Sequence, residues 1–169
     1  MGQVAQTSRR PARIVYTGVV TEVPQAFQDV LNDFANLDRS ERAELLIEFA
    51  DEFHDVPPTI AERPFSEENH VQRCESEAFV FPEELPDGTL KFHFAVENPQ
   101  GLSAKAWSVI LAETLSGKPL EEVAAVSPES VMTVFGRDIS MGKGQGLMGI
   151  TDMVTHAAKR RLAARKAAR

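Results

Sequence analysis

The segment His70-Val71-Gln72-Arg73-Cys74-Glu75-Ser76-Glu77-Ala78-Phe79-Val80-Phe81 lies near the middle of the 169-residue chain. Its last four residues, 78–81, form a short apolar run of aromatic and β-branched side chains, which favours a buried strand over a helix. Polar residues flank Cys74, the only cysteine of the chain, and this predicts a loop. The segment therefore places a lone thiol where a polar loop enters a strand.

The residues that follow this segment complete a hairpin. Residues 89–96 alternate apolar with polar side chains, and the turn residues Pro86-Asp87-Gly88 precede them. We therefore expect 78–81 and 89–96 to pair as antiparallel strands, with one face of the pair buried and the other in contact with water.

Apolar residues at helical spacing predict helices on both sides of this hairpin. Upstream, one helix begins at Pro24 and a second at Asp38 or Ser40, where Asp38 and Glu41 have the spacing of a capping box. Downstream, helices are expected over residues 102–115, from Pro119, over 127–134 and from Leu147 onward. Leu102 is expected among the buried residues of the first of these downstream helices.

The segment 136–146 contains four glycines, and we expect it to form a loop before the last helix. It has neither the order of a phosphate-binding P-loop nor that of a dinucleotide-binding motif, and no strand clearly precedes it. A nucleotide site is therefore not expected here. The loop is instead expected to carry Arg137 and Lys143 toward a partner or toward the thiol.

This order of elements predicts an α+β fold, a small antiparallel β-sheet with helices packed on one face. We expect one domain over residues 14–160, a flexible basic N-terminal tail over 1–13 and a basic C-terminal tail over 161–169. No internal repeat or second domain boundary is visible in the sequence.

Charge and composition exclude several classes of protein. The net charge is −7 and the pI is about 5.1, which argues against nucleic acid as the main partner. No stretch has the apolar length of a membrane helix, and none resembles a secretion signal. With a single cysteine, these features lead us to expect a cytoplasmic protein.

Cys74 has two interpretations. A lone cysteine is most often a small buried hydrophobe, and the alternative is a reactive thiol. Arg73 would stabilise a thiolate at Cys74, whereas Glu75 and Glu77 would oppose it. The local charges therefore leave both interpretations open.

Metal binding and hydrolysis are two further possibilities for this part of the chain. His54, His70 and Cys74 do not have the spacing of a zinc site, so we expect no metal. A Cys–His hydrolase would use His54 or His70 as the base, but no orienting third residue is evident.

The order of these parts, over about residues 27–161, resembles the SufE-type cysteine desulfuration proteins. The segments that carry the resemblance are 42–50 with 54–58 (the family's leucine-rich helix and proline loop), 71–79 (its cysteine signature), 103–107 (its basic residue at a helix start) and 140–147 (its Ser-Pro-x-Arg-x-x-Gly stretch). Cys74 and Ser76 of the signature are retained.

Four positions depart from the family's pattern. Arg73 stands where the family usually has Gly or, in some branches, Glu, and Glu75 stands where it has Gln. Lys143 replaces a usual Arg, and Ala106 replaces a usual Gly. Two departures flank the thiol itself, so its reactivity or its partner is expected to differ from the family's.

The resemblance implies a SufE/IscU-like fold and a role in iron–sulfur cluster assembly. In this role Cys74 accepts persulfide sulfur from a PLP-dependent cysteine desulfurase, stimulates that enzyme and passes the sulfur to an iron–sulfur scaffold complex. The residues implied to support the thiol or dock the partner are Arg73, Ser76, Lys105, Lys143 and His70.

Such a protein is a sulfur-transfer accessory without its own cofactor rather than a stand-alone enzyme, and we expect a monomer or a homodimer. The alternative is a non-catalytic interaction module of the same fold, in which the thiol of Cys74 is inert or regulatory.

Overall fold

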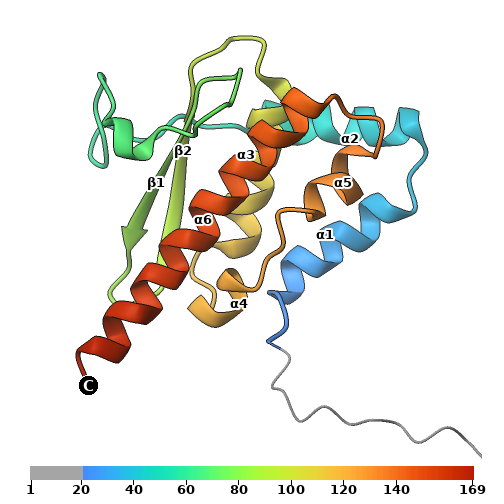
Figure 1. The fold of residues 1–169 in the computed structure, drawn as a ribbon. Coiled ribbons are helices and arrows are strands. Elements are labelled where there is room, and N and C mark those ends of the chain that lie inside the picture. The colour runs from blue at the N-terminus through green and yellow to red at the C-terminus, as the bar shows by residue number, and fades with distance from the viewer. Residues whose placement is uncertain (1–20) are drawn as a thin grey trace, which may run out of the picture.

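The computed structural model describes residues 21–169 (Figure 1). Its elements, in chain order, are α1 (Gln25–Ala35), α2 (Arg39–Asp51), the short 3₁₀ helix η1 (Glu67–Asn69), β1 (Ala78–Glu84), β2 (Leu90–Val96), α3 (Leu102–Leu115), α4 (Leu120–Ala124), α5 (Ser130–Phe135) and α6 (Met141–Ala167). The fold is α+β, as predicted. The tail expected over residues 1–13 lies outside the described residues.

The two strands form an antiparallel hairpin in which Phe81 pairs with His93. β1 is three residues longer than the apolar run predicted, because pairing continues through Pro82 to the turn. In a two-stranded sheet each strand is an edge, so a proline can occupy β1 without removing a ladder hydrogen bond.

Helix α3 lies at the centre of the core. α1, α2, β2 and α6 all contact it, and its Trp107 has no exposed surface. The indole of Trp107 donates a hydrogen bond to Thr151 Oγ1 of α6 at 2.9 Å, which satisfies its one polar group. Leu102, predicted to be buried, is instead 41% exposed, because it begins α3 at the rim of the core.

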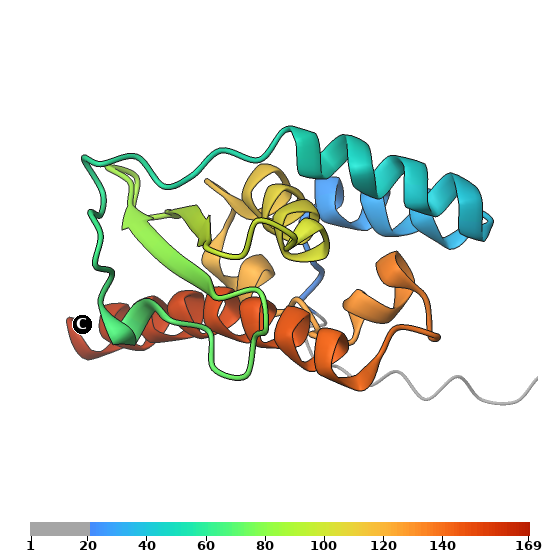
Figure 2. The same cartoon turned by 90° about the horizontal axis from the view of Figure 1, so that it is seen from above.

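The two faces of the hairpin have different surroundings. Val80, Phe92 and Phe94 point into the main core, while Phe81 and Ala95 point to the other side. That second face is partly covered rather than fully solvated, because the segment between α2 and η1 packs against it through Val56, Phe65 and their neighbours. Figure 2 shows this segment running past the upper and left-hand sides of the hairpin.

Helix α6 begins at Met141, six residues before the predicted start, and so includes much of the expected glycine-rich loop. Ser140 caps it, since its Oγ accepts a hydrogen bond from the Lys143 backbone N–H at 3.4 Å. The glycines remain helical because they allow close packing, described below. None of the helices within residues 21–169 has the length and apolar character needed to cross a membrane.

The C-terminal end of α6 contacts the tip of the hairpin. Arg161 pairs with Glu84, and Arg165 donates a hydrogen bond to the Gly88 carbonyl at 2.6 Å. Residues 161–167, predicted as part of a basic tail, are therefore helical and in contact with the body of the fold.

The capping box of α2 provides a test of the fold. Asp38 Oδ1 accepts a hydrogen bond from the Glu41 backbone N–H, and Glu41 Oε2 accepts one from the Asp38 backbone N–H, both at 2.9 Å. We expect Asp38→Ala to lower the free energy of unfolding by about 1 kcal/mol. Urea denaturation measures this change. Asp33→Ala, which removes an exposed carboxylate from α1, should have a smaller effect, and equal effects would contradict the capping role.

Candidate functional site

A tight loop of residues 71–77 presents Cys74. Its ends are joined by a hydrogen bond from the Val71 N–H to the Ala78 carbonyl at 2.9 Å, and within it the Glu77 N–H donates to the Cys74 carbonyl at 3.1 Å. Arg73 and Glu77 have φ angles of +60° and +49°, in the left-handed region that side chains other than glycine seldom adopt. The backbone around the thiol is therefore strained.

The thiol of Cys74 is buried against helix α6. The residue is 7% exposed and has no disulfide partner. A Cβ atom built on Gly146 would lie 3.2 Å from Cys74 Sγ and 3.3 Å from its Cα, so a side chain at this position would force the loop or the helix to shift by a few tenths of an ångström. Figure 2 shows the loop lying along the N-terminal half of α6.

A pocket of about 350 Å³ opens beside the thiol. It is lined by the thiol loop, the start of α3 and the start of α6, through Cys74, Glu75, Ser76, Asn98, Gln100, Gly101, Leu102, Ser103, Ala104, Gly142, Lys143 and Leu147. Of the residues predicted to support the thiol, Ser76 and Lys143 line this pocket together with Cys74.

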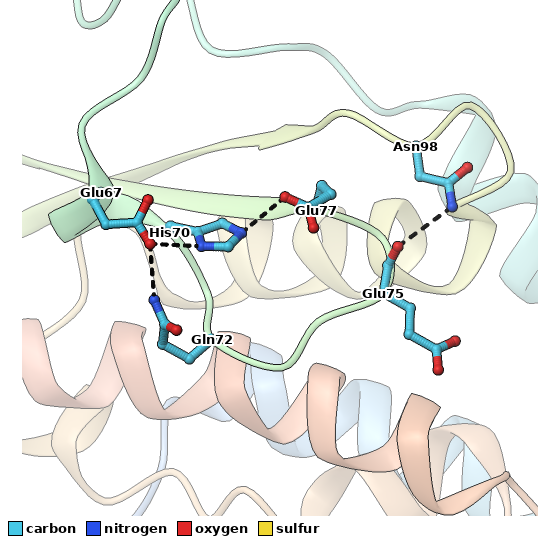
Figure 3. Close-up of polar contacts among 6 residues, drawn as sticks. All are labelled: Glu67, His70, Gln72, Glu75, Glu77 and Asn98. Carbon is cyan, nitrogen blue, oxygen red and sulfur yellow. Dashed lines mark hydrogen bonds and ion pairs between the residues drawn. The ribbon is translucent and has the colours of Figure 1, made fainter.

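The pocket holds one cation and one carboxylate, on Lys143 and Glu75. Glu75 points toward α6, and a Cβ atom on Gly142 would lie 3.2 Å from its Oε1 (Figure 3). Its backbone carbonyl accepts a hydrogen bond of 3.5 Å from Asn98 Nδ2. An anion that enters the pocket would therefore meet both an attractive and a repulsive charge.

His70 lies at the base of the loop and outside the residues that line the pocket. Its Nδ1 is 3.2 Å from Glu67 Oε1 and its Nε2 is 3.0 Å from Glu77 Oε2 (Figure 3). Its ring also packs on Phe79. Gln72 Nε2 donates to the same Glu67 oxygen. His70 thus ties the loop to η1 and to the start of β1.

Arg73 and Lys105 also lie outside the pocket lining. Arg73 is exposed at the turn of the loop. Lys105 Nζ lies 6.0 Å from the centre of the Phe53 ring, near the end of α2. Neither side chain is therefore positioned beside the thiol in this conformation.

Sequence reasoning missed Leu102, Gly142 and Gly146 as part of the site. The glycines were detectable in principle, because Gly142, Gly146 and Gly149 recur at spacings of four and three, which places them on one face of a helix. No group of three or more His, Cys, Asp or Glu side chains within residues 21–169 could hold a metal ion.

The family model described as "SufE: Fe-S metabolism associated domain" matches residues 28–158. The chain belongs to the SufE family. The match includes the thiol loop, α3 and the glycine face of α6, which are the elements that build the pocket. Membership of SufE places the chain in iron–sulfur metabolism.

Individual relatives agree with this assignment. A protein described as an "uncharacterized SufE-like protein", found in two strains of Mycobacterium tuberculosis, is 28% identical over 114 residues, covering 68% of this chain and 76% of the relative. The solution structure of a hypothetical protein from Thermus thermophilus matches with a TM-score of 0.64. At 23% identity, over 83% of this chain and 98% of that one, it supports the fold alone.

Paired alanine substitutions test the packing of α6 on the thiol. Both Gly144→Ala and Gly146→Ala gain helix propensity, worth up to about 1 kcal/mol. A Cβ on Gly144 meets nothing closer than 3.7 Å, whereas one on Gly146 presses on Cys74. We expect Gly144→Ala to stabilise the protein and Gly146→Ala to stabilise it less and to raise the rate of Cys74 alkylation by iodoacetamide. Identical behaviour of the two variants in urea and toward iodoacetamide would contradict this packing.

Proposed function

We propose that this SufE-family protein carries sulfur on Cys74. The protein accepts persulfide sulfur from a PLP-dependent cysteine desulfurase and passes it to an iron–sulfur scaffold complex, acting in the cytoplasm, where a lone thiol stays reduced. The observation that carries the proposal is that the only cysteine of a SufE-family chain lines a surface pocket, on a strained loop, rather than lying in the interior of a helix or strand.

The chemistry is a thiol–disulfide exchange. The Cys74 thiolate attacks the outer sulfur of the desulfurase persulfide, and the bond between that sulfur and the enzyme's cysteine breaks. The desulfurase cysteine leaves as a thiolate, and Cys74 becomes a persulfide. No external oxidant is needed, and freeing the enzyme's cysteine for another turnover would stimulate the desulfurase.

Burial of the thiol implies two states of the loop. A residue that is 7% exposed cannot reach a sulfur on another protein, so residues 71–77 must move outward for the transfer. The positive φ angles of Arg73 and Glu77 disfavour the closed state and lower the cost of that movement. On return, the pocket of about 350 Å³ has room for the added sulfur atom and shelters it from reductants.

A second candidate function is an interaction module with an inert or regulatory thiol. The burial of Cys74 and the carboxylate of Glu75 in its pocket favour this alternative. The two functions differ in whether sulfur becomes attached to the protein.

Measurement of the intact mass of the protein distinguishes the sulfur carrier from the interaction module. The protein is mixed with a cysteine desulfurase, PLP and cysteine, and its mass is read with and without reductant. We expect a gain of one or more sulfur atoms that reductant removes and that Cys74→Ser abolishes, with the fold of the variant checked by circular dichroism. No gain, with a desulfurase proven active on another acceptor, would contradict sulfur carriage.

Two substitutions at Arg73 distinguish the effect of its backbone strain from the effect of its charge. Arg73→Gly removes both the charge and the left-handed strain, whereas Arg73→Ala removes the charge and keeps the strain, which costs about 1 kcal/mol. We expect sulfur transfer to Cys74 to be preserved in both variants, because the guanidinium lies outside the pocket, and to be slower in Arg73→Gly, because glycine relieves the strain that favours opening of the loop. If both variants slow the transfer equally and raise the thiol pKa, Arg73 instead activates the thiol.

A further inference from the structure

A second and larger pocket, of about 570 Å³, lies next to the thiol pocket. α2, the start of α3 and the connection from α5 to α6 line it, through Arg39, Arg42, Ala43, Leu46, Ser103, Phe135, Gly136, Arg137, Asp138, Ile139, Ser140 and Lys143. Ser103 and Lys143 line both pockets, so the two pockets are neighbours. We call the larger one the basic pocket.

The charge of this pocket is opposite to that of the whole protein. Four cationic side chains, Arg39, Arg42, Arg137 and Lys143, face one carboxylate, Asp138, in a chain of net charge −7. Like charges gathered from three separate elements create a local positive potential that attracts anions.

The cations are largely unpaired within residues 21–169. The single ion pair of the pocket joins Arg39 to Asp138 at 3.9 Å, between side chains that are 93% and 70% exposed, and such pairs contribute little. Arg42, Arg137 and Lys143 make no ion pair with the described residues. These three guanidinium and ammonium groups therefore remain available to an incoming anion.

Arg42 is the most constrained of the four. Its Nε is buried and has no hydrogen-bond partner among the described residues. A Cβ atom on Gly136, whose φ is +88°, would lie 2.8 Å from Arg42 Nη1, so the loop after α5 bends closely around this guanidinium. A carboxylate that reached Arg42 would supply an acceptor that this part of the chain lacks.

The residues that line the basic pocket favour a protein segment over a small molecule as its ligand. Arg39 and Arg137 are exposed at its rim, while Leu46, Phe135 and Ile139 give it apolar surface between the charges. A rim of exposed cations around partly buried apolar groups matches the organisation of a protein interface.

We propose that the basic pocket binds an acidic segment of the desulfurase, with its carboxylates on Arg39, Arg42 and Arg137, and so holds that enzyme beside the thiol pocket. This inference rests on the proposed function, because it names the docking contact of the same transfer. Lys143, which lines both pockets, lies where the docked segment meets the thiol loop.

The double variant Arg39→Glu/Arg137→Glu tests the proposal. Both side chains are exposed, so the fold should be retained. We expect its affinity for the desulfurase, measured by biolayer interferometry without cysteine, to fall about tenfold or more at low ionic strength and by less at high ionic strength. Loading of Cys74 by inorganic polysulfide, which requires no docking, should be unchanged.

The matched control is Lys166→Glu/Arg169→Glu, which makes the same change in net charge on exposed residues at the far end of α6. An equal loss of affinity in both double variants, or none in either, would overturn the basic pocket as the docking site. If wild type and Arg39→Glu/Arg137→Glu bind and take up sulfur equally, only this inference fails. If the wild-type protein neither binds the desulfurase nor gains sulfur from it, both the proposed function and this inference fail.

Discussion

The contact between Gly146 of α6 and Cys74 determines how the rest of the site is arranged. A Cβ atom there would lie 3.2 Å from the thiol sulfur, so a side chain at this position would force the helix or the loop to shift by a few tenths of an ångström. Gly149 makes a similar approach to Val71, with its Cβ position 3.0 Å from that side chain. Through these two contacts one long helix closes the back of the thiol pocket and fixes where its Lys143 lies relative to the loop.

Much of the fold was predictable because the responsible interactions are local in sequence. The capping box of Asp38 and Glu41 and the alternation in residues 89–96 involve neighbours along the chain, and both predicted elements are observed. The start of α6 was not predictable in this way. Its glycines weaken a helix by local propensity, and the contacts that compensate come from residues 71–75, far away in sequence.

In the candidate site, too, local features were predictable from the sequence and long-range contacts were not. Cys74 and Ser76 are close in the sequence and share a pocket, and Lys143 joins them because α6 begins earlier than its glycines suggest. The direction of a side chain in a loop depends on φ and on tertiary packing. For this reason sequence reasoning could not place Arg73 at the exposed turn, nor His70 between two carboxylates. Nothing in the sequence around the arginines of α2 indicates that they line a pocket.

Helix α6 contacts β1 and the chain segments that precede and follow this strand. Near its start the helix packs on the thiol loop that leads into β1, and near its end Arg161 and Arg165 bind the hairpin tip. The outward movement of Cys74 that the proposed function requires therefore involves only a few residues on either side of the thiol. On the proposed function, the rate of sulfur delivery depends on the local energetics of the thiol loop rather than on the stability of the whole domain.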